Sequence, residues 1–541
     1  MHRLILGALF AVIVGGMLHS PVLAANAANP CWRPGVGATV ARPPDLYSRA
    51  GVLRAALDYV TAVDAEGRTL FCFKTRDGQE SPTLHVRPGD TLDITVTNRV
   101  PALPSDQPVE IISNMSNVCG ALTMTETSVN VHFHGTNTAP VCHSDEVIHT
   151  LINSGQTFRY LVHIPRDEPP GLYWYHPHVH GIAEAAVQGG GSGAIVVEGI
   201  AALQPAVVGL PEQILLIRDQ TVGAPPVTGK PVPAWDLSLN YVPISYPGYR
   251  PAVLEVVPGR REFWRVVNAA ADTIIDLQLR FDGQPQPLDV VALDGVPTGS
   301  QDGTRRGRIV TVTDILLPPA ARAEFIVTAP TSSVQKAELV TRNIDTGPDG
   351  DFDPQRPLAV LRATAQPQAM AAMTEPTMTA WPQRFEGLDN APVTAHRKLY
   401  FSEVLSDPNN PASPTNFYIT VDGAKPRLFD PANPPAITTV QGSVEDWTIE
   451  NRSEENHEFH IHQIHFKLLA RDGVPVSRDQ RQMLDMVQVP YWKGHGPYPS
   501  VTVRMDFRGP DIGDFVYHCH ILGHEDNGMM AIIRVLPRHH S

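Results

Sequence analysis

Three twelve-residue segments of the chain repeat one pattern. They read RPGDTLDITVTN from Arg87, VPGRREFWRVVN from Val257 and VQGSVEDWTIEN from Val440. Each copy has Gly third, an aliphatic residue tenth and Asn twelfth. A Gly turn that leads into alternating residues is typical of a turn followed by a β-strand. The repeat therefore predicts three copies of one β domain.

The composition agrees with a chain built mainly from strands. Gly and Pro number 41 and 51, and charged residues make up 18% of the chain, which means frequent turns and little helix-forming charge. With the repeat, this predicts an all-β protein of three consecutive domains. The predicted division is a signal peptide at 1–27, domains at 28–200, 201–366 and 385–541, and a linker at 367–384. The three Met of the linker would also suit a copper-binding segment, but a plain linker is favoured.

The charge balance excludes some classes of partner. Lys and Arg number 42 against 56 Asp and Glu, which gives a net charge of −14. Such a charge opposes binding to phosphate backbones and to anionic membrane surfaces. We therefore expect no nucleic-acid partner.

The N-terminal segment differs from the rest of the chain. A short basic start precedes an uncharged apolar run from Leu4 to Met17, and small residues follow. The run is shorter than the roughly 20 residues of a membrane span, so it indicates a secretory signal peptide cleaved after Ala24 or Ala27. An uncleaved anchor is the alternative. We expect an exported protein, periplasmic or secreted, with no membrane span after signal removal.

The chain has five cysteines: Cys31, Cys72, Cys119, Cys142 and Cys519. In an oxidising compartment four of them can pair, and Cys519 is the odd one because it lies between two histidines. Pairing of nearest neighbours would join Cys31 to Cys72 and Cys119 to Cys142. Four cysteines allow three connectivities, and the sequence alone does not choose among them.

Histidines recur at spacing two far more often than chance predicts. The chain has 22 histidines among 541 residues, for which random placement gives roughly one such pair. Five pairs are present: His132 with His134, His176 with His178, His178 with His180, His460 with His462, and His518 with His520. Alternate residues of a strand point to the same face, so each pair can offer two imidazoles to metal.

The last cluster, HCHILGHEDNGMM from His518, is the most specific. The Cys519 thiolate is followed by an imidazole at His524 and by a thioether at Met529. Two His, one Cys and a weakly bound Met are the ligands of a blue-copper centre, with His457 as candidate for the second imidazole. Zinc also binds Cys and His, but the thioether argues against it. On a strand Cys519 and its His neighbours point to opposite faces, so one segment can reach two metal sites.

Four clusters together resemble the copper-binding motifs of multicopper oxidases, and most of all those of bacterial three-domain, laccase-like members. They are VHFHGTN from Val131, YWYHPHVHG from Tyr173, HEFHIHQIHF from His457 and HCHILGHEDNGMM from His518. The resemblance implies three cupredoxin-like Greek-key β-sandwich domains and four copper ions: one type 1, one type 2 and a type 3 pair. The trinuclear cluster of types 2 and 3 would lie between domains one and three, with domain two as a spacer.

The same resemblance implies a role for each ligand. The type 1 copper would be bound by His457, Cys519, His524 and Met529. The type 2 copper would be bound by His132 and His460. The type 3 pair would be bound by His134, His176, His178, His462, His518 and His520.

Three residues depart from the family pattern or add to it. Glu458 follows His457 where the third motif usually has Pro, which removes a rigid turn residue and would place a carboxylate beside the type 1 copper. His180 and His465 make the second and third clusters ambiguous on spacing alone. We interpret both as residues outside the ligand set, either next to a ligand or on the surface.

The resemblance implies an oxidase that takes electrons one at a time at the type 1 site. They would pass through Cys519 to the trinuclear site, where dioxygen is reduced to water. The reductant would be a phenol or an aromatic amine. The alternative is a metal oxidase that acts on Cu(I), Mn(II) or Fe(II), for which we expect Met or carboxylate side chains near the type 1 edge. A copper carrier of the same fold would have lost ligands, and here all are present.

Reduction of dioxygen to two waters consumes four protons. Histidines bound to metal do not supply them, so nearby carboxylates are needed as relays. Asp145, eleven residues past His134, and Glu525, directly after His524, resemble acids near the trinuclear cluster of laccase-like enzymes. We predict that both relay protons; the alternative is that each is an exposed loop charge.

Overall fold

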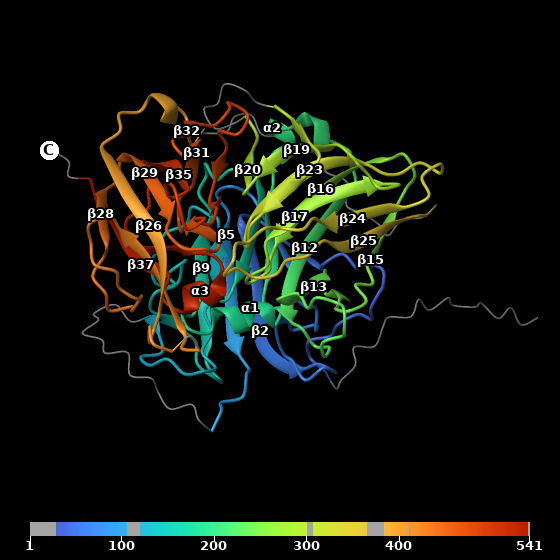
Figure 1. The fold of residues 1–541 in the computed structure, drawn as a ribbon, viewed down its shortest axis with the longest axis horizontal. Helices are drawn as coiled ribbons and strands as arrows, with labels where there is room; N and C mark the ends of the chain where they lie inside the picture. Colours follow the sequence, from blue (N-terminus) through green and yellow to red (C-terminus); the bar gives the residue numbers. More distant parts are fainter. Residues whose placement is uncertain (1–28, 105–118, 300–306, 365–383, 411, 539–541) are drawn as a thin grey trace, which may run out of the picture.

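The computed structural model describes residues 29–104, 119–299, 307–364, 384–410 and 412–538. The predicted signal peptide and all but the last residue of the predicted linker lie outside these ranges. Strands dominate the fold and form three pairs of sheets that follow one another along the chain (Figure 1). The helices of the described residues are short: α1 (Ala183–Gln188), α2 (Ile200–Leu203), α3 (Leu522–Asp526) and the 3-10 turns η1 (Pro205–Val207) and η2 (Leu388–Asn390).

The first pair of sheets has the strand orders β3-β2-β5-β9 and β1-β4-β11-β10-β7. A small parallel ladder of β6 and β8 accompanies it. The strands of this first sandwich are β1 (Asp45–Tyr47), β2 (Val52–Val63), β3 (Thr69–Thr75), β4 (Thr83–Val86), β5 (Thr91–Asn98), β6 (Cys119–Gly120), β7 (His132–His134), β8 (Thr150–Leu151), β9 (Thr157–His163), β10 (Gly171–His176) and β11 (Gly193–Val197).

The second pair has the orders β14-β13-β12-β16-β23-β19-β20, with β21 on β19, and β15-β25-β24-β17-β18, with β22 on β17. The strands of this second sandwich are β12 (Glu212–Thr221), β13 (Trp235–Leu239), β14 (Val242–Ile244), β15 (Ala252–Val256), β16 (Arg261–Asn268), β17 (Ile275–Phe281), β18 (Gln284–Pro285), β19 (Leu288–Leu293), β20 (Val296–Pro297), β21 (Val310–Val312), β22 (Ile315–Leu317), β23 (Arg322–Thr328), β24 (Ala337–Thr341) and β25 (Arg356–Ala363).

The third pair has the orders β27-β26-β29-β35-β31-β32, with β33 on β31, and β28-β37-β36-β30-β34. The strands of this third sandwich are β26 (Ala395–Leu405), β27 (Thr415–Val421), β28 (Ile437–Val440), β29 (Val444–Asn451), β30 (His457–Ile461), β31 (Phe466–Arg471), β32 (Val474–Pro475), β33 (Met483–Leu484), β34 (Met486–Val489), β35 (Ser500–Asp506), β36 (Gly513–Cys519) and β37 (Met530–Leu536).

The three repeats occupy the same place in the three sandwiches. Their strands β5, β16 and β29 each pair in parallel with one neighbour and antiparallel with the other. The Gly of each repeat has a positive φ, between 71° and 96°, which a residue without a Cβ adopts readily. The repeat thus encodes the turn and the central strand of each sandwich, and the predicted all-β fold is confirmed. The domain boundaries given above stay predictions.

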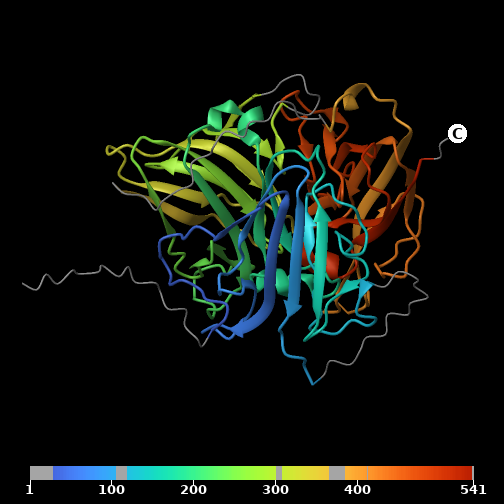
Figure 2. The same ribbon diagram turned by 180° about the vertical axis from the view of Figure 1, so that it is seen from behind.

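The second and third sandwiches lie on either side of the first. The third, in orange and red, and the second, in green and yellow, are seen at opposite ends of Figure 1. From behind, the blue and cyan strands of the first sandwich stand between them (Figure 2). Each sandwich has an apolar core, and apolar residues also pack between sandwiches, since the core of the second includes Leu172 and Trp174 of the first and Met486 of the third.

Two disulfides join Cys31 to Cys72 and Cys119 to Cys142. The nearest-neighbour pairing is therefore correct, and Cys519 is the free, buried cysteine among those that the structure describes. Within the same ranges, the helices are too short or too polar to cross a bilayer.

Candidate metal centres

Eight histidines meet where the first sandwich faces the third. Five of them lie on the paired strands β7 and β10 or β30 and β36, and three follow within two residues of a strand end: His178, His462 and His520. In these ladders His176 lies opposite His132, and His460 lies opposite His518. All eight side chains are at most 1% exposed: His132, His134, His176, His178, His460, His462, His518 and His520.

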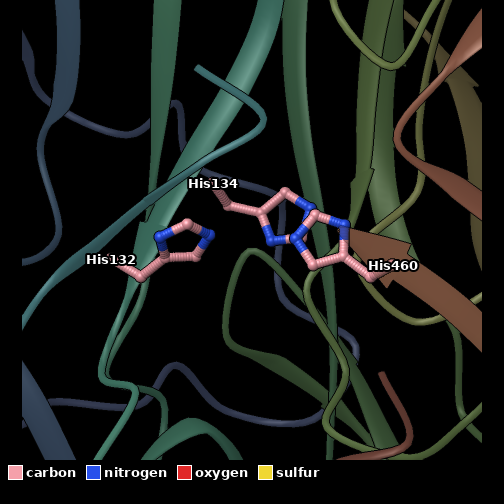
Figure 3. Close-up of side chains that lie close together, drawn as sticks. All are labelled: His132, His134 and His460. Carbon is pink, nitrogen blue, oxygen red and sulfur yellow. The ribbon is translucent and has the colours of Figure 1, made fainter. Parts of the chain in front are cut away.

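The ring nitrogens converge in three groups, the first two of which share His134, and in each group the possible ligand atoms lie within 4.8 Å of one another. The groups are His132, His134 and His460; His134, His176 and His520; and His178, His462 and His518. Figure 3 shows the first group, in which the rings of His134 and His460 stack 4.1 Å apart. In the third group, the Nε2 atoms of His178 and His462 lie 3.3 and 3.2 Å from Nε2 of His518.

Four of these rings are held by their Nδ1 atoms. His460 Nδ1 donates to the carbonyl of Asp485 at 2.8 Å, His176 Nδ1 to that of Pro177 at 2.9 Å, and His518 Nδ1 to that of Cys519 at 2.9 Å. His132 Nδ1 lies 2.9 Å from Asp145 Oδ1. A bond to Nδ1–H fixes the tautomer, so the other nitrogen, Nε2, faces inward as an acceptor.

Many ring nitrogens of the cluster lack hydrogen-bond partners among the described residues. They include Nε2 of His132, His176 and His460 and both ring nitrogens of His134 and His520. Burial first, and then the charge of neighbouring histidines, lowers the pKa of His132, His134 and His460 well below the ordinary value. Buried neutral imidazoles with orphaned acceptors are ligands for metal, and this donor set fits copper.

A second centre surrounds Cys519 in the third sandwich. The Cys519 Sγ lies 3.6 Å from His457 Nδ1 and 3.7 Å from His524 Nδ1. These two nitrogens are 3.1 Å apart. Met529 is buried beside them, and its carbonyl accepts the backbone N–H of Cys519 at 3.1 Å. One thiol and two imidazoles therefore converge next to a methionine, in a segment whose flanking residues His518 and His520 belong to the first centre.

Comparison with known proteins agrees with these two centres. The multicopper oxidase family profiles match residues 110–201 and 407–539, which contain all twelve predicted ligands. The chain belongs to the multicopper oxidase family. It is a copper-dependent oxidase.

Relatives of this multicopper oxidase come from plants and bacteria. Multicopper oxidase LPR1 homolog 1 of Oryza sativa is 23% identical, with 87% of this chain and 86% of that protein covered. The laccase of Bacillus subtilis is 24% identical over 70% of this chain and 74% of its own. A Campylobacter jejuni multicopper oxidase described as a metallo-oxidase superposes with a TM-score of 0.65 at 20% identity, covering 94% and 96% of the two chains. These likenesses confirm the predicted cupredoxin-like sandwiches.

The two predicted relay acids of this oxidase are both buried. Asp145 accepts from the backbone N–H of Phe133 at 2.9 Å and from Gln463 Nε2 at 2.8 Å, and burial raises its pKa to about 7. Glu525 has no hydrogen-bond partner among the described residues, and its Oε1 lies 3.8 Å from Nδ1 of His178. Burial and then the charge of Asp526 raise the pKa of Glu525 strongly. The alternative of an exposed loop charge is therefore wrong for both.

The outer nitrogens of the Cys519 centre are bonded to carboxylates. His457 Nε2 lies 2.9 Å from Glu403 Oε1 and 2.7 Å from Ser453 Oγ. His524 Nε2 lies 3.0 Å from Glu455 Oε1. A carboxylate on the far nitrogen orients an imidazole and makes it a stronger donor. The predictions missed both glutamates; the acid-rich run before His457 contains one of them, whereas Glu403 has no signal in the sequence.

A pocket of about 280 Å³ reaches the edge of His524. Five carboxylates line it, and the described lining includes neither Lys nor Arg: Glu184, Asp272, Asp351, Asp353 and Glu455. Burial, together with the charges of Asp219 and Glu184, raises the pKa of Asp272 well above its ordinary value. The Phe417 ring stacks 4.2 Å from the His524 ring and forms an apolar wall. The pocket therefore combines an acidic lining with direct access to His524 of the Cys519 centre.

The structure corrects the expected place of Glu458. Its backbone N–H donates to Cys519 Sγ at 3.3 Å, but its carboxyl accepts from Gln488 Nε2 at 3.1 Å. Strand alternation explains the difference, because His457 faces Cys519 and the next side chain must point to the opposite face. The amide, not the carboxylate, is what lies beside the thiol.

The two additional histidines have different surroundings. His180 is partly exposed, with its ring 4.8 Å from that of Phe429, and shares a group of possible ligand atoms with Glu525 and Asp526. His465 is fully buried, and its Nε2 donates to the carbonyl of Asp294 at 2.9 Å. A surface position is therefore wrong for His465.

Proposed function

We propose that the two centres hold four copper ions with the ligands implied by the family resemblance. His457, Cys519, His524 and Met529 would bind the type 1 copper, His132 and His460 the type 2 copper, and the remaining six histidines the type 3 pair. The three groups of converging nitrogens support this division, because each type 3 ion receives three imidazoles from one group. The orphaned inward nitrogens support it too.

The bound coppers would accept four electrons singly at the type 1 site and deliver them, with four protons, to one dioxygen to give two waters. The chain itself contributes a short covalent path between the two centres. Cys519 belongs to one centre and its neighbours His518 and His520 to the other, so a few covalent bonds separate electron entry from oxygen reduction.

For the electron donor, the acidic pocket favours the metal-oxidase alternative over a phenol. The observation that carries this is the set of five carboxylates at the edge of His524, with Glu455 bonded to Nε2. Hard and borderline cations such as Fe(II) and Mn(II) take carboxylate oxygens as ligands. A neutral phenol gains little from this lining, whereas a bound cation favours the ionised form of nearby carboxyl groups. We propose that the reductant is a metal cation bound against His524.

The experiment is steady-state oxygen uptake with Fe(II), Mn(II), Cu(I), a phenol and an aromatic diamine side by side, with enzyme-free blanks. Asp351→Asn removes an exposed carboxylate of the pocket and should raise KM for the metal ion about five- to tenfold, the effect of roughly 1 kcal/mol of charge attraction. Asp349→Asn, two residues away and outside the pocket lining, is the matched control. Turnover of the phenol with no metal-ion oxidation above the blank would contradict the proposal and favour the phenol as the reductant.

We also propose that the protein is exported. Two disulfides support an oxidising compartment, since such bonds are rare in the cytosol. Mass spectrometry of the purified protein should find a mature N-terminus after Ala24 or Ala27.

A further inference from the structure

The second sandwich supplies an arginine at the junction of all three sandwiches. Arg322, the first residue of β23, is fully buried. Its Nη1 and Nη2 donate to Oδ1 and Oδ2 of Asp485, in the third sandwich, at 2.6 and 2.5 Å. Its Nε donates to the carbonyl of Leu172, in the first sandwich, at 3.2 Å. This bidentate pair is therefore in contact with every sandwich.

Asp485 in turn contacts two ligands of the histidine cluster. Its carbonyl accepts the Nδ1–H of His460 at 2.8 Å, and its Oδ1 lies 3.5 Å from Nε2 of His134. The rings of these two histidines stack on each other (Figure 3). The residue after His134, Gly135, packs so closely that an added Cβ would overlap both the Arg322 guanidinium and the Asp485 carboxylate.

The second sandwich also holds the backbone of Asp485. Asp294 Oδ2 accepts the N–H groups of Asp485 and Met486 at 3.2 and 3.3 Å, and its Oδ1 accepts the N–H of Arg322 at 2.9 Å. Side chain and main chain of Asp485 are thus both fixed from the second sandwich. A carbonyl in this position sets the orientation of the His460 ring.

We propose that Arg322 is a positioning residue of the oxygen-reducing cluster: through Asp485 it fixes the rings of His134 and His460. The second sandwich is then part of the cluster's support and more than a spacer. A buried ion pair adds little net stability compared with apolar residues of similar size. Its geometric precision, with two parallel bonds, is what suits it to hold two ligands. This inference rests on the proposed assignment of His134 and His460 as type 3 and type 2 ligands.

The test separates positioning from the cost of an unpaired buried charge. Arg322→Lys keeps the positive charge but loses the two parallel N–H donors of the guanidinium. Arg322→Met combined with Asp485→Leu removes both charges. Arg265→Lys is the matched control, because Arg265 is fully buried in the adjacent strand β16 and paired with Glu212 and Glu324. Copper content, the blue colour, the type 2 electron paramagnetic resonance signal and stopped-flow reoxidation by oxygen are measured on each.

We expect both Arg322 variants to keep the blue colour of the type 1 site. They should show an altered type 2 signal, less bound copper and reoxidation slower by about 10- to 100-fold, the usual effect of removing an outer support of a metal ligand. The Arg265 control should match wild type. A folded double variant with wild-type signal and rate would overturn the proposal. Wild-type protein without a type 2 signal would instead contradict the copper assignment itself.

Discussion

At the scale of single residues, the two buried acids of the histidine cluster differ in how firmly they are held. Asp145 accepts two hydrogen bonds from neighbouring groups and also contacts His132. Glu525 is without such partners in the described structure. A proton relay must release its proton as well as bind it, so a carboxyl free to rotate suits repeated transfer. If both acids relay protons as predicted, we therefore expect Glu525 to be the more direct donor and Asp145 to orient the His132 ring as well.

Glu525→Gln and Asp145→Asn should both keep four coppers and the blue colour yet slow reoxidation of the reduced enzyme by oxygen. We expect about a 100-fold loss for Glu525→Gln, the contribution of a positioned proton donor, and a smaller loss for Asp145→Asn. Stopped-flow reoxidation measures both. Glu168→Gln is the control, because Glu168 is equally buried but is bonded to Asn137 and to none of the eight histidines. Wild-type rates in both variants would contradict the prediction that these two acids relay protons.

Met529→Leu should raise the reduction potential of the type 1 site. A weak thioether donor stabilises Cu(II), so its removal favours the reduced ion. Leu is close to Met in volume, and we expect the free energy of unfolding to fall by less than about 1.5 kcal/mol. Spectroelectrochemical titration of the blue band gives the potential. Met530→Leu serves as the neighbouring control; a shift in that variant alone would make Met530 the donor.

The convergence of the histidines could be predicted from the sequence, but the residues that hold them in place could not. A pair such as His518 and His520 is visible because alternate residues of an extended segment share a face. Glu403 and Arg322 lie 54 and 163 residues from the partners they hold, His457 and Asp485. Contacts of that separation leave no pattern in a single sequence.

At the scale of elements, the repeated Asn explains why the three copies fold alike. Asn98, Asn268 and Asn451 are fully buried, and the Nδ2 of each donates to two backbone carbonyls. Each therefore ties the end of a central strand to two other segments. The turn, the strand and the Asn that bonds to the other segments all lie within twelve residues, so the sandwiches could be predicted. The short helix α3, which carries His524, could not be predicted, because it lacks a side-chain cap and is too short to show a helical pattern of apolar residues.

Asn268→Ala should lower the stability of the fold by about 2 kcal/mol. Two buried carbonyls, those of Thr273 and Leu317, would lose their donor, and each such loss costs roughly 1 to 3 kcal/mol before relaxation. Thermal unfolding of the copper-free protein measures the effect. Asn409→Ala is the control, because Asn409 is exposed. A variant with the melting temperature of wild type would show that the repeated Asn has no such role.

At the scale of the whole molecule, the histidine cluster joins sandwiches that are distant in sequence. Four of its histidines come from the first sandwich and four from the third, and the second sandwich holds both through Arg322. Apolar contacts also join the sandwiches, because the core of the second includes Trp174 of the first and Met486 of the third. Ligands bound to a shared ion would add to these links, so metal should contribute to the stability of the whole.

Removal of copper should lower the melting temperature by an amount that is the same at pH 7.5 and at pH 5. Imidazole binds metal only in its neutral form. In the fold, burial holds the pKa of histidines such as His460 far below the ordinary value, and that of His518 at about 3, whereas in the unfolded chain it returns to about 6.5. The unfolded chain therefore takes up protons below pH 6.5 that the folded histidines do not. Their contribution to stability is complete above pH 6.5 and is lost below it.

The folded histidines are still neutral at pH 5 and available to copper, so calorimetry of loaded and copper-free protein should show a gap of about 10 °C at both pH values, while both melting temperatures fall. The buried acids act in the opposite direction. With its pKa raised to about 7, Asp145 contributes fully below pH 4 and loses that contribution as the pH rises towards 7. This term is present in the copper-free protein, so the gap between the two forms isolates copper binding. A gap that closes by pH 5 would mean that the folded imidazoles take up protons near their ordinary pKa.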